Sequence, residues 1–118
     1  MPTILVAEND APVRKLISEV LREQGYRVLS ASSGDEATGL AARSDQPIDL
    51  VVTDIVMTGM GGADLWAWMK AEQPAARVLF ISGFMSREPL EGDFLKKPFT
   101  RTELVEKVRA VLARGAGG

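Results

Sequence analysis

The feature that most constrains this chain is an alternation of strand-like and helix-like segments along its 118 residues. Short apolar runs, which are typical of strands, are separated by segments whose apolar residues recur every three or four positions. Alternation of this kind with short connections predicts right-handed crossovers and an α/β domain with a doubly wound parallel sheet. The expected strands are Thr3–Ala7, Arg27–Ser30, Ile48–Thr53, Arg77–Ser82 and Asp93–Lys96.

The helices expected between and after these strands have recognisable ends. A Ser or Thr followed three residues later by Glu forms a capping box, and this pattern occurs at Ser33 and again at Thr100. Asp10 is expected to cap the first helix, ahead of an apolar stripe with helical spacing. We expect helices that begin after Asp10, at Ser33, at about Gly62 and at Thr100, and that end at Gly25, Ser44, Gln73 and Arg114.

The interval between the fourth and fifth strands is short. Fourteen residues separate Ser82 from Lys97, and Pro89 and Gly92 fall where a helix interior would be needed. Because proline and glycine disfavour helix interiors, we expect a loop or a single turn there. The fourth crossover helix is therefore predicted to be short or absent.

Two tryptophans lie two positions apart in the third helix, so both cannot face the core. We expect Trp68 to point inward together with Leu65 and Met69. Trp66 is then expected to be partly exposed, either as packing or as a contact for a partner.

Composition excludes several kinds of site. The chain contains no Cys and no His, which rules out disulfides, thiolate or histidine metal sites, and catalysis by either side chain. The net charge of −2 leaves no excess of cations for a phosphate backbone, so nucleic acid is not expected as a ligand. The apolar runs are strand-sized, and we therefore expect no membrane span, no signal peptide and a cytoplasmic location.

Polar side chains gather where the expected strands end. Glu8 and Asn9 follow the first strand, Asp54 the third, Ser82 the fourth and Lys97 the fifth. In a doubly wound sheet, ligands bind outside this carboxyl edge. Carboxylates, a hydroxyl and an ammonium at one edge are suited to a hard divalent cation and a phosphoryl group, and Mg²⁺ is the natural cation.

Five landmarks in order make the chain resemble the receiver domain of two-component response regulators over essentially its full length. They are Glu8-Asn9, Asp54 after an apolar strand, Met57 with Gly62, Ser82-Gly83 and Lys97-Pro98-Phe99. The stretches around Asp54 and Ser82 are also similar to receivers attached to hybrid histidine kinases. The resemblance implies a flavodoxin-like five-stranded sheet in the order 2-1-3-4-5, with residues 1–114 as the receiver domain. The glycine-rich composition of residues 115–118 predicts a flexible tail.

The resemblance also implies an acceptor and a metal site. Asp54 would accept a phosphoryl group from a phosphohistidine on a histidine kinase or a histidine phosphotransfer protein. Glu8, Asn9, Asp54 and the backbone carbonyl of Val56 would surround Mg²⁺, which would offset the phosphoryl charge.

Two further residues would act on the phosphoryl group. Lys97 would pair with Asp54 at rest and with a phosphoryl oxygen afterwards, and a cis peptide before Pro98 would aim it inward. Ser82 would turn its hydroxyl to a phosphoryl oxygen, moving the following loop and letting Phe94 change rotamer.

The chain departs from the family at Asn9, where a receiver usually has an aspartate that ligates the metal. The Asn9 amide oxygen can coordinate, but the site has two carboxylates in place of three. We therefore expect Mg²⁺ to bind weakly, because one unit of negative charge is missing beside it.

Two other functions remain open. The chain could be a receiver-like module that takes up no phosphoryl group and acts only by protein contact, which Asn9 favours. It could be a Mg²⁺-dependent aspartyl-phosphate phosphatase, but such enzymes need an acid two residues after the nucleophile, where this chain has Val56. The receiver interpretation implies no enzyme activity beyond its own phosphorylation and dephosphorylation. It also implies output by direct contact, through a surface that includes the helix at residues 100–114.

Overall fold

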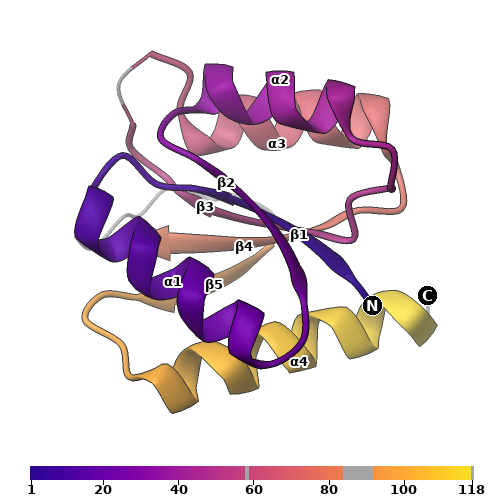
Figure 1. Ribbon diagram of the computed structural model, residues 1–118. Coiled ribbons are helices and arrows are strands. Elements are labelled where there is room, and N and C mark those ends of the chain that lie inside the picture. Colours follow the sequence, from indigo (N-terminus) through magenta and orange to yellow (C-terminus); the bar gives the residue numbers. More distant parts are fainter. Residues whose placement is uncertain (58, 84–91, 118) are drawn as a thin grey trace.

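The computed structural model describes residues 1–57, 59–83 and 92–117, and its strands form one parallel sheet in the order β2-β1-β3-β4-β5 (Figure 1). The strands are β1 (Thr3–Ala7), β2 (Arg27–Ala31), β3 (Leu50–Asp54), β4 (Arg77–Ser82) and β5 (Asp93–Lys96). All five predicted strands are present, and the predicted doubly wound order is confirmed.

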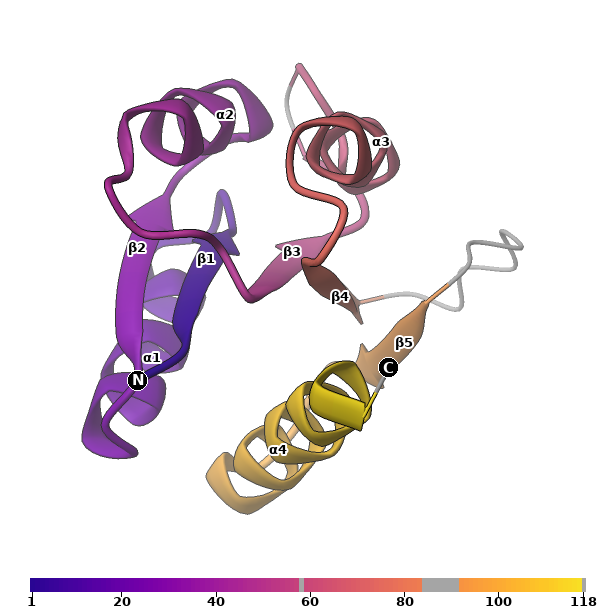
Figure 2. The same ribbon diagram turned by 90° about the vertical axis from the view of Figure 1, so that its right-hand side faces the viewer.

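Helices cover both faces of the sheet. α1 (Ala11–Glu23) and α4 (Arg101–Gly117) lie on one face, and α2 (Gly34–Arg43) and α3 (Gly62–Glu72) lie on the other (Figure 2). In β1, Ile4 belongs to the core under α1 and α4, whereas its neighbour Leu5 belongs to the core under α2 and α3. Because successive strand side chains point to opposite faces, a strand covered on both sides is apolar at every position.

Side-chain caps start the helices where the sequence pattern predicts them. Thr100 and Glu103 form a complete capping box: the Glu103 N–H donates to the Thr100 hydroxyl at 3.0 Å, and the Thr100 N–H donates to the Glu103 carboxylate at 2.8 Å. The Ser33 hydroxyl likewise accepts from the Glu36 N–H at 3.0 Å. The second hydrogen bond of this capping box differs from the usual pattern. The Glu36 carboxylate accepts from the N–H of Ser32, at 2.6 Å, and not from that of the capping residue Ser33.

β3 begins at Leu50, two residues later than predicted. Ile48 is buried, as a strand residue would be, but its N–H donates to the side-chain oxygen of Gln73 at 2.7 Å. The loop before β3 is therefore held by the residue that ends α3, a contact that the local apolar pattern does not reveal.

A loop or a single turn was predicted for the segment after β4. Residues 84–91 lie outside the described part of the chain, and so does the prediction that the crossover helix is short or absent. α4 continues to Gly117, three residues beyond the predicted end. Among the described residues, no helix combines the length and the apolarity that a membrane crossing requires.

Of the two tryptophans of α3, Trp66 is partly exposed as predicted, whereas Trp68 is less inward than predicted. Leu65 and Met69 are fully buried as expected, but Trp66 and Trp68 are both half-buried at the margin of the same core. At 3.6 residues per turn, each indole lies about 80° from the direction midway between Leu65 and Met69. Trp68 is therefore no more inward than Trp66, and the two rings flank the buried stripe symmetrically.

Candidate functional site

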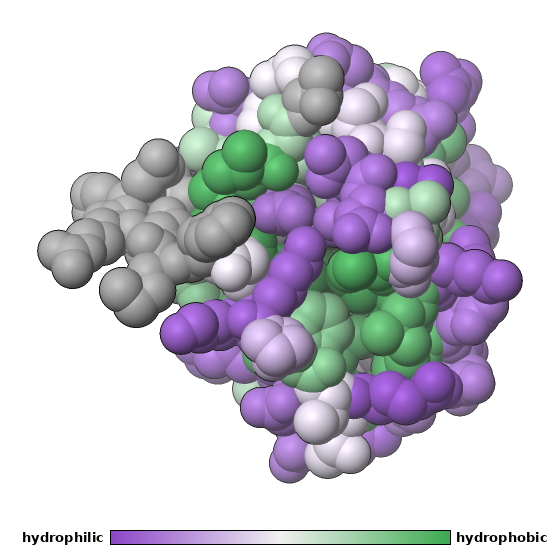
Figure 3. Space-filling view, turned by 90° about the vertical axis from the view of Figure 1, so that its left-hand side faces the viewer, coloured by the Kyte–Doolittle hydropathy of each residue, from purple (hydrophilic) through white to green (hydrophobic). Residues whose placement is uncertain are grey.

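Four strands bring polar side chains to the carboxyl edge of the sheet. Glu8 follows β1, Asp54 ends β3, Ser82 ends β4 and Lys97 follows β5. The parallel register brings these ends to one level, since Asp54 lies beside Ile81 and Ser82 lies beside the residue before Lys97. Figure 3 looks onto this edge and shows hydrophilic side chains next to an apolar patch.

One ammonium group joins two of these strand ends. The Lys97 Nζ lies 3.0 Å from Asp54 Oδ2, and it also lies 3.2 Å and 3.3 Å from the two carboxylate oxygens of Glu8. The Glu8 side chain is only 1% exposed, whereas the Asp54 side chain is 13% exposed. Asp54 is thus the carboxylate that a reagent from solution can reach, and Glu8 lies behind it.

The crowding of these charges changes their ionisation. Burial, and after it the neighbouring Asp54 carboxylate, raises the pKa of Glu8 to about 7, although Lys97 opposes the shift. For Lys97, burial lowers the pKa, but the hydrogen bond to Asp54 and the charges of Glu8 and Asp54 outweigh it and raise the pKa above its ordinary value. Lys97 therefore stays cationic, while Glu8 changes charge near neutral pH.

The turn that carries Glu8 is held by hydrogen bonds to its own backbone and side chain. The Arg14 guanidinium donates to the Glu8 carbonyl oxygen at 2.9 Å, and the Asp10 N–H donates to the Glu8 carboxylate at 3.2 Å. Asp10 also caps α1 as predicted, accepting from the Val13 N–H at 3.4 Å. The sequence analysis did not identify Arg14. Its only sequence signal for this contact is its position in the first turn of α1, after the capping residue Asp10.

The backbone after Asp54 turns tightly around its carbonyl group. The Val56 N–H approaches Asp54 Oδ1 at 3.4 Å, and the Gly62 N–H donates to the Ile55 carbonyl oxygen at 2.9 Å. A Cβ atom on Gly62 would collide with the carbonyl oxygen of Asp54. The absence of a side chain at residue 62 therefore allows α3 to start directly against the strand end that carries Asp54.

The other predicted site residues lie near Glu8, Asp54 and Lys97. Asn9 is exposed beside Glu8, Val56 is 78% exposed, and Ser82 is half-buried, with its carbonyl oxygen accepting from the Lys97 N–H at 2.7 Å. The Lys97-Pro98 peptide is cis, as the resemblance implies.

The oxygens at this edge are suited to a hard cation. Across residues 1–57, 59–83 and 92–117, no cluster of three or more Asp, Glu, His or Cys side chains is placed to hold a metal ion. Three carboxylate oxygens of Glu8 and Asp54 nevertheless converge on one cation, the Lys97 ammonium. The donor set is all oxygen, which Mg²⁺ prefers, and Asn9 directly follows Glu8 in the chain.

An apolar groove of about 470 Å³ adjoins the ammonium of Lys97. Its walls are Val13 and Leu16 of α1 and the segment Pro98-Phe99 after β5. The Leu16 side chain is 38% exposed, which is unusual for a residue of the apolar stripe of α1. An exposed apolar groove of this kind is a typical feature of a surface that contacts another protein.

The chain is similar in sequence and fold to proteins of one family. A family model for the response regulator receiver domain matches residues 4–109. The response regulator receiver protein CpdR of Brucella abortus is 31% identical over 119 residues, with 95% of this chain and 98% of CpdR covered. By contrast, the chain spans only about half the length of two probable transcriptional regulatory proteins among its relatives, one of them TcrX of Mycobacterium tuberculosis.

Two solved structures show the same fold. The receiver domain of the hybrid histidine kinase CckA is 34% identical, with a TM-score of 0.83, and the match covers 93% of this chain and 98% of that domain. The response regulator TrrA of Thermotoga maritima, solved in complex with Mg²⁺ and BeF, is 28% identical with a TM-score of 0.82. That match covers 94% of this chain and 99% of TrrA.

Proposed function

The chain belongs to the response regulator receiver domain family of two-component signalling, and we propose that Asp54 is the residue on which it accepts a phosphoryl group. The observation that carries this proposal is the position of Asp54. Its carboxylate ends β3 at the carboxyl edge, is partly open to solvent and lies 3.0 Å from the Lys97 ammonium. A nucleophile must be reachable and its transition state must be stabilised, and Asp54 meets both requirements.

The phosphoryl group comes from a second protein. None of the 118 residues is a histidine, so a phosphohistidine donor lies outside them. An oxygen of the Asp54 carboxylate attacks the phosphorus, the new O–P bond forms as the P–N bond breaks, and the imidazole nitrogen leaves with the electron pair. Lys97 faces the charge that develops on the phosphoryl oxygens, and such positioning and electrostatics carry most of the catalysis in phosphoryl transfer.

Glu8, Asn9, Asp54 and the backbone carbonyl of Val56 would hold Mg²⁺. When bound, Mg²⁺ offsets the negative charge of the phosphoryl group. The relative TrrA was solved with Mg²⁺ and BeF, which supports a metal at the equivalent edge of this chain. Because Asn9 supplies a neutral amide and Lys97 already contacts both carboxylates, we propose that Mg²⁺ binds weakly here.

Ser82 and Phe94 would carry the signal away from Asp54. We propose that the Ser82 hydroxyl binds a phosphoryl oxygen, which displaces the chain after β4. Phe94 of β5 is 38% exposed and its ring lies 5.5 Å from that of Phe80 in β4. A movement at the end of β4 is therefore transmitted to an exposed aromatic ring, and the ring changes the surface that a partner meets.

The proposed partners are proteins on both sides of the transfer. A histidine kinase or a histidine phosphotransfer protein would dock on the groove of Val13, Leu16 and Phe99, which leads to Lys97. A downstream partner would contact the surface that includes α4. We propose that the chain acts in the cytoplasm without binding nucleic acid, since its net charge of −2 offers no excess cation to a phosphate backbone.

Intact-mass analysis after incubation with Mg²⁺ and acetyl phosphate tests the acceptor. We expect a single phosphoryl adduct on the parent chain and none on Asp54→Asn. Asp64→Asn is the matched control, because Asp64 is an exposed carboxylate on α3 outside the site, and it should be labelled like the parent. An adduct that persists on Asp54→Asn would refute the assignment. No adduct on the parent with any donor would favour a module that acts only by contact.

A further inference from the structure

Arg14 of α1 contacts the turn between β1 and α1 at two carbonyl groups. Its guanidinium donates to the Glu8 carbonyl oxygen at 2.9 Å, and its backbone N–H donates to the Asp10 carbonyl oxygen at 2.8 Å. Asn9, the neutral residue of the proposed metal site, lies between these two carbonyl groups in the chain. Arg14 therefore holds the backbone on both sides of Asn9.

The positive charge of Arg14 is unfavourable for a site that binds a cation. Glu8 and Asn9 are two of the proposed ligands of Mg²⁺, and the Lys97 ammonium already lies beside Glu8. A second positive charge repels Mg²⁺, so electrostatics alone would favour a neutral or acidic residue at position 14. Among the described residues, no acidic side chain forms an ion pair with Arg14 that would neutralise this charge.

The contribution of Arg14 that favours a metal is the geometry of the turn. The Glu8 N–H donates to the Ala31 carbonyl oxygen at 3.0 Å, which fixes the chain before Glu8. The Glu8 carbonyl belongs to the peptide group that leads into Asn9, and the Arg14 guanidinium fixes this group from the other side. Arg14 is half-buried, whereas its neighbour Lys15 is 76% exposed. Ligands on a turn that is already ordered lose little conformational freedom when they bind.

We propose that Arg14 is a positioning residue for the metal site. By fixing the peptide group between Glu8 and Asn9, it orients the turn so that both residues can meet the same Mg²⁺ ion. This inference rests on the metal site of the proposed function, and it adds a residue that is not itself a ligand. The charge of Arg14 opposes Mg²⁺ binding and its hydrogen bond favours it, and the hydrogen bond has the larger effect.

An NMR titration of the whole chain with MgCl₂ at constant ionic strength separates these two effects by their sign. The backbone N–H shifts of Glu8 and Val56 report binding. Arg14→Met removes the charge and the hydrogen bond together. We expect Mg²⁺ to bind about tenfold more weakly, which is the effect usual for losing a group that orients a metal ligand. A role through charge alone would give tighter binding, because a like charge is gone.

Two further variants sharpen the comparison. Lys15→Met makes the same substitution at the adjacent, exposed cation and should change the affinity by less than about twofold. Arg14→Lys keeps the charge but donates from a flexible stem, so it should weaken binding by an intermediate factor of about three. A role through charge alone predicts no change in Arg14→Lys, which tests the inference even if Arg14→Met does not fold.

The ¹³C shift of the Glu8 carbonyl tests the contact in the metal-free protein. A carbonyl carbon moves upfield when it loses a hydrogen-bond donor, so Arg14→Met should show this change and Lys15→Met should not. An unchanged Glu8 shift, or Mg²⁺ affinity in Arg14→Met equal to or higher than that of the parent, would overturn the inference alone. A parent chain that binds no Mg²⁺ would refute the proposed metal site and this inference with it.

Discussion

The Lys97 ammonium lies 3.2 Å from Oε1 of Glu8, although the two residues are 89 positions apart in the chain. Glu8 is almost completely buried, and Lys97 is the cation that accompanies it. The same ammonium contacts the proposed acceptor carboxylate, so whatever binds at the acceptor also changes the surroundings of Glu8. The acceptor and the metal ligands therefore behave as one electrostatic unit, and the first three predictions concern it.

Lys97→Met is expected to slow phosphoryl transfer to Asp54 and yet tighten Mg²⁺ binding. Loss of the ammonium removes a group that stabilises the transition state, which typically costs about a hundredfold in rate. It also removes the cation that occupies both carboxylates, so Mg²⁺ affinity should rise about tenfold. Lys96→Met, at the exposed neighbour, should change neither quantity. Calorimetry that showed unchanged or weaker Mg²⁺ binding in Lys97→Met would contradict the competition.

Glu8 should make the free energy of unfolding depend on pH. Its pKa rises from 4.5 to about 7 on folding, so between these values the native state holds the proton more tightly than the unfolded chain does. The stabilisation is complete below pH 4.5 and is lost as pH rises to about 7, at up to about 1.4 kcal/mol per pH unit.

Glu8→Gln isolates this contribution, since glutamine cannot titrate. Urea unfolding in metal-free buffer across the same pH range should give a shallower decline in stability for the variant than for the parent. Carboxylates away from this site contribute equally to both proteins, so the difference between the two curves reports Glu8 and its contacts. Parallel curves would show that Glu8 does not titrate in this range.

Asn9→Asp should restore the third carboxylate of the metal site. One added unit of negative charge beside Mg²⁺ is expected to tighten binding on the order of tenfold, because solvent screens this exposed position. Asp64→Asn, an exchange at an exposed position of α3, should leave the affinity as it is. If calorimetry finds the same Mg²⁺ affinity in Asn9→Asp and the parent, Asn9 does not adjoin the metal.

Gly62→Ala should destabilise the fold at the acceptor. The new Cβ would collide with the backbone oxygen of Asp54, and such overpacking costs about 2 kcal/mol. Gly39→Ala in α2 is the contrasting control, since its Cβ would meet only the flexible end of Arg43 at 3.3 Å, and alanine should stabilise that helix by about 0.5–1 kcal/mol. Urea unfolding measures both, and similar effects of the two substitutions would mean that the contact with Asp54 does not matter.

Leu16→Glu should impair uptake from a protein donor but not from a small molecule. A charge in the apolar groove opposes docking, whereas acetyl phosphate needs no groove. We expect about tenfold slower transfer from a phosphorylated histidine phosphotransfer protein that labels the parent, and unchanged labelling by acetyl phosphate. Gln46→Glu adds the same charge at an exposed position outside the groove and should affect neither. Equal slowing with both donors would place the defect at Asp54 instead.

Local pattern was enough to predict the elements of this fold. Apolar runs identified all five strands, and Asp10, Ser33 and Thr100 marked three helix starts, because strand burial and capping depend on residues a few positions apart. The start of β3 was predicted two residues early, since burial of Ile48 comes with a hydrogen bond to Gln73 on another element. The prediction that Trp68 points inward was wrong, because Trp68 and Trp66 are both half-buried at the edge of the core.

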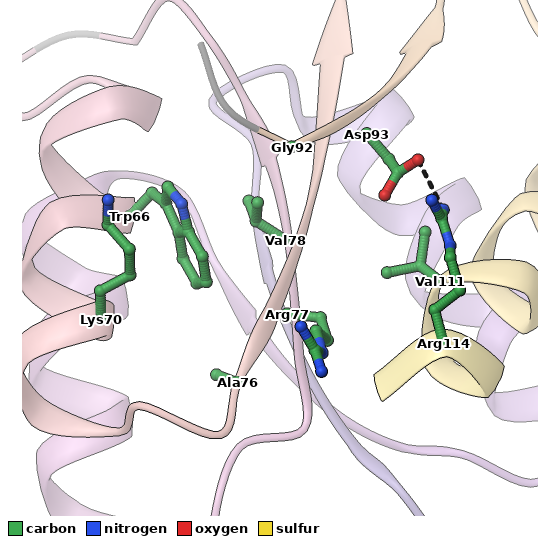
Figure 4. A pocket seen from close by; sticks show the side chains of 9 residues that line it. All are labelled: Trp66, Lys70, Ala76, Arg77, Val78, Gly92, Asp93, Val111 and Arg114. Atoms are coloured by element: carbon green, nitrogen blue, oxygen red, sulfur yellow. Dashed lines mark ion pairs between the residues drawn. The ribbon is translucent and has the colours of Figure 1, made fainter. Parts of the chain in front are cut away.

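By itself the sequence determined which residues end the strands, and parallel pairing then brings Glu8, Asp54, Ser82 and Lys97 to one edge. Only the tertiary structure decided that one ammonium lies between two carboxylates and that Arg14 holds the Glu8 carbonyl. It alone also placed Trp66 and Arg114, from helices on opposite faces, at the lining of one cavity beside the start of β4 (Figure 4). The types of the elements follow from local periodicity, and the resemblance to receiver domains implied the strand order. Distances between distant side chains depend on how the layers pack.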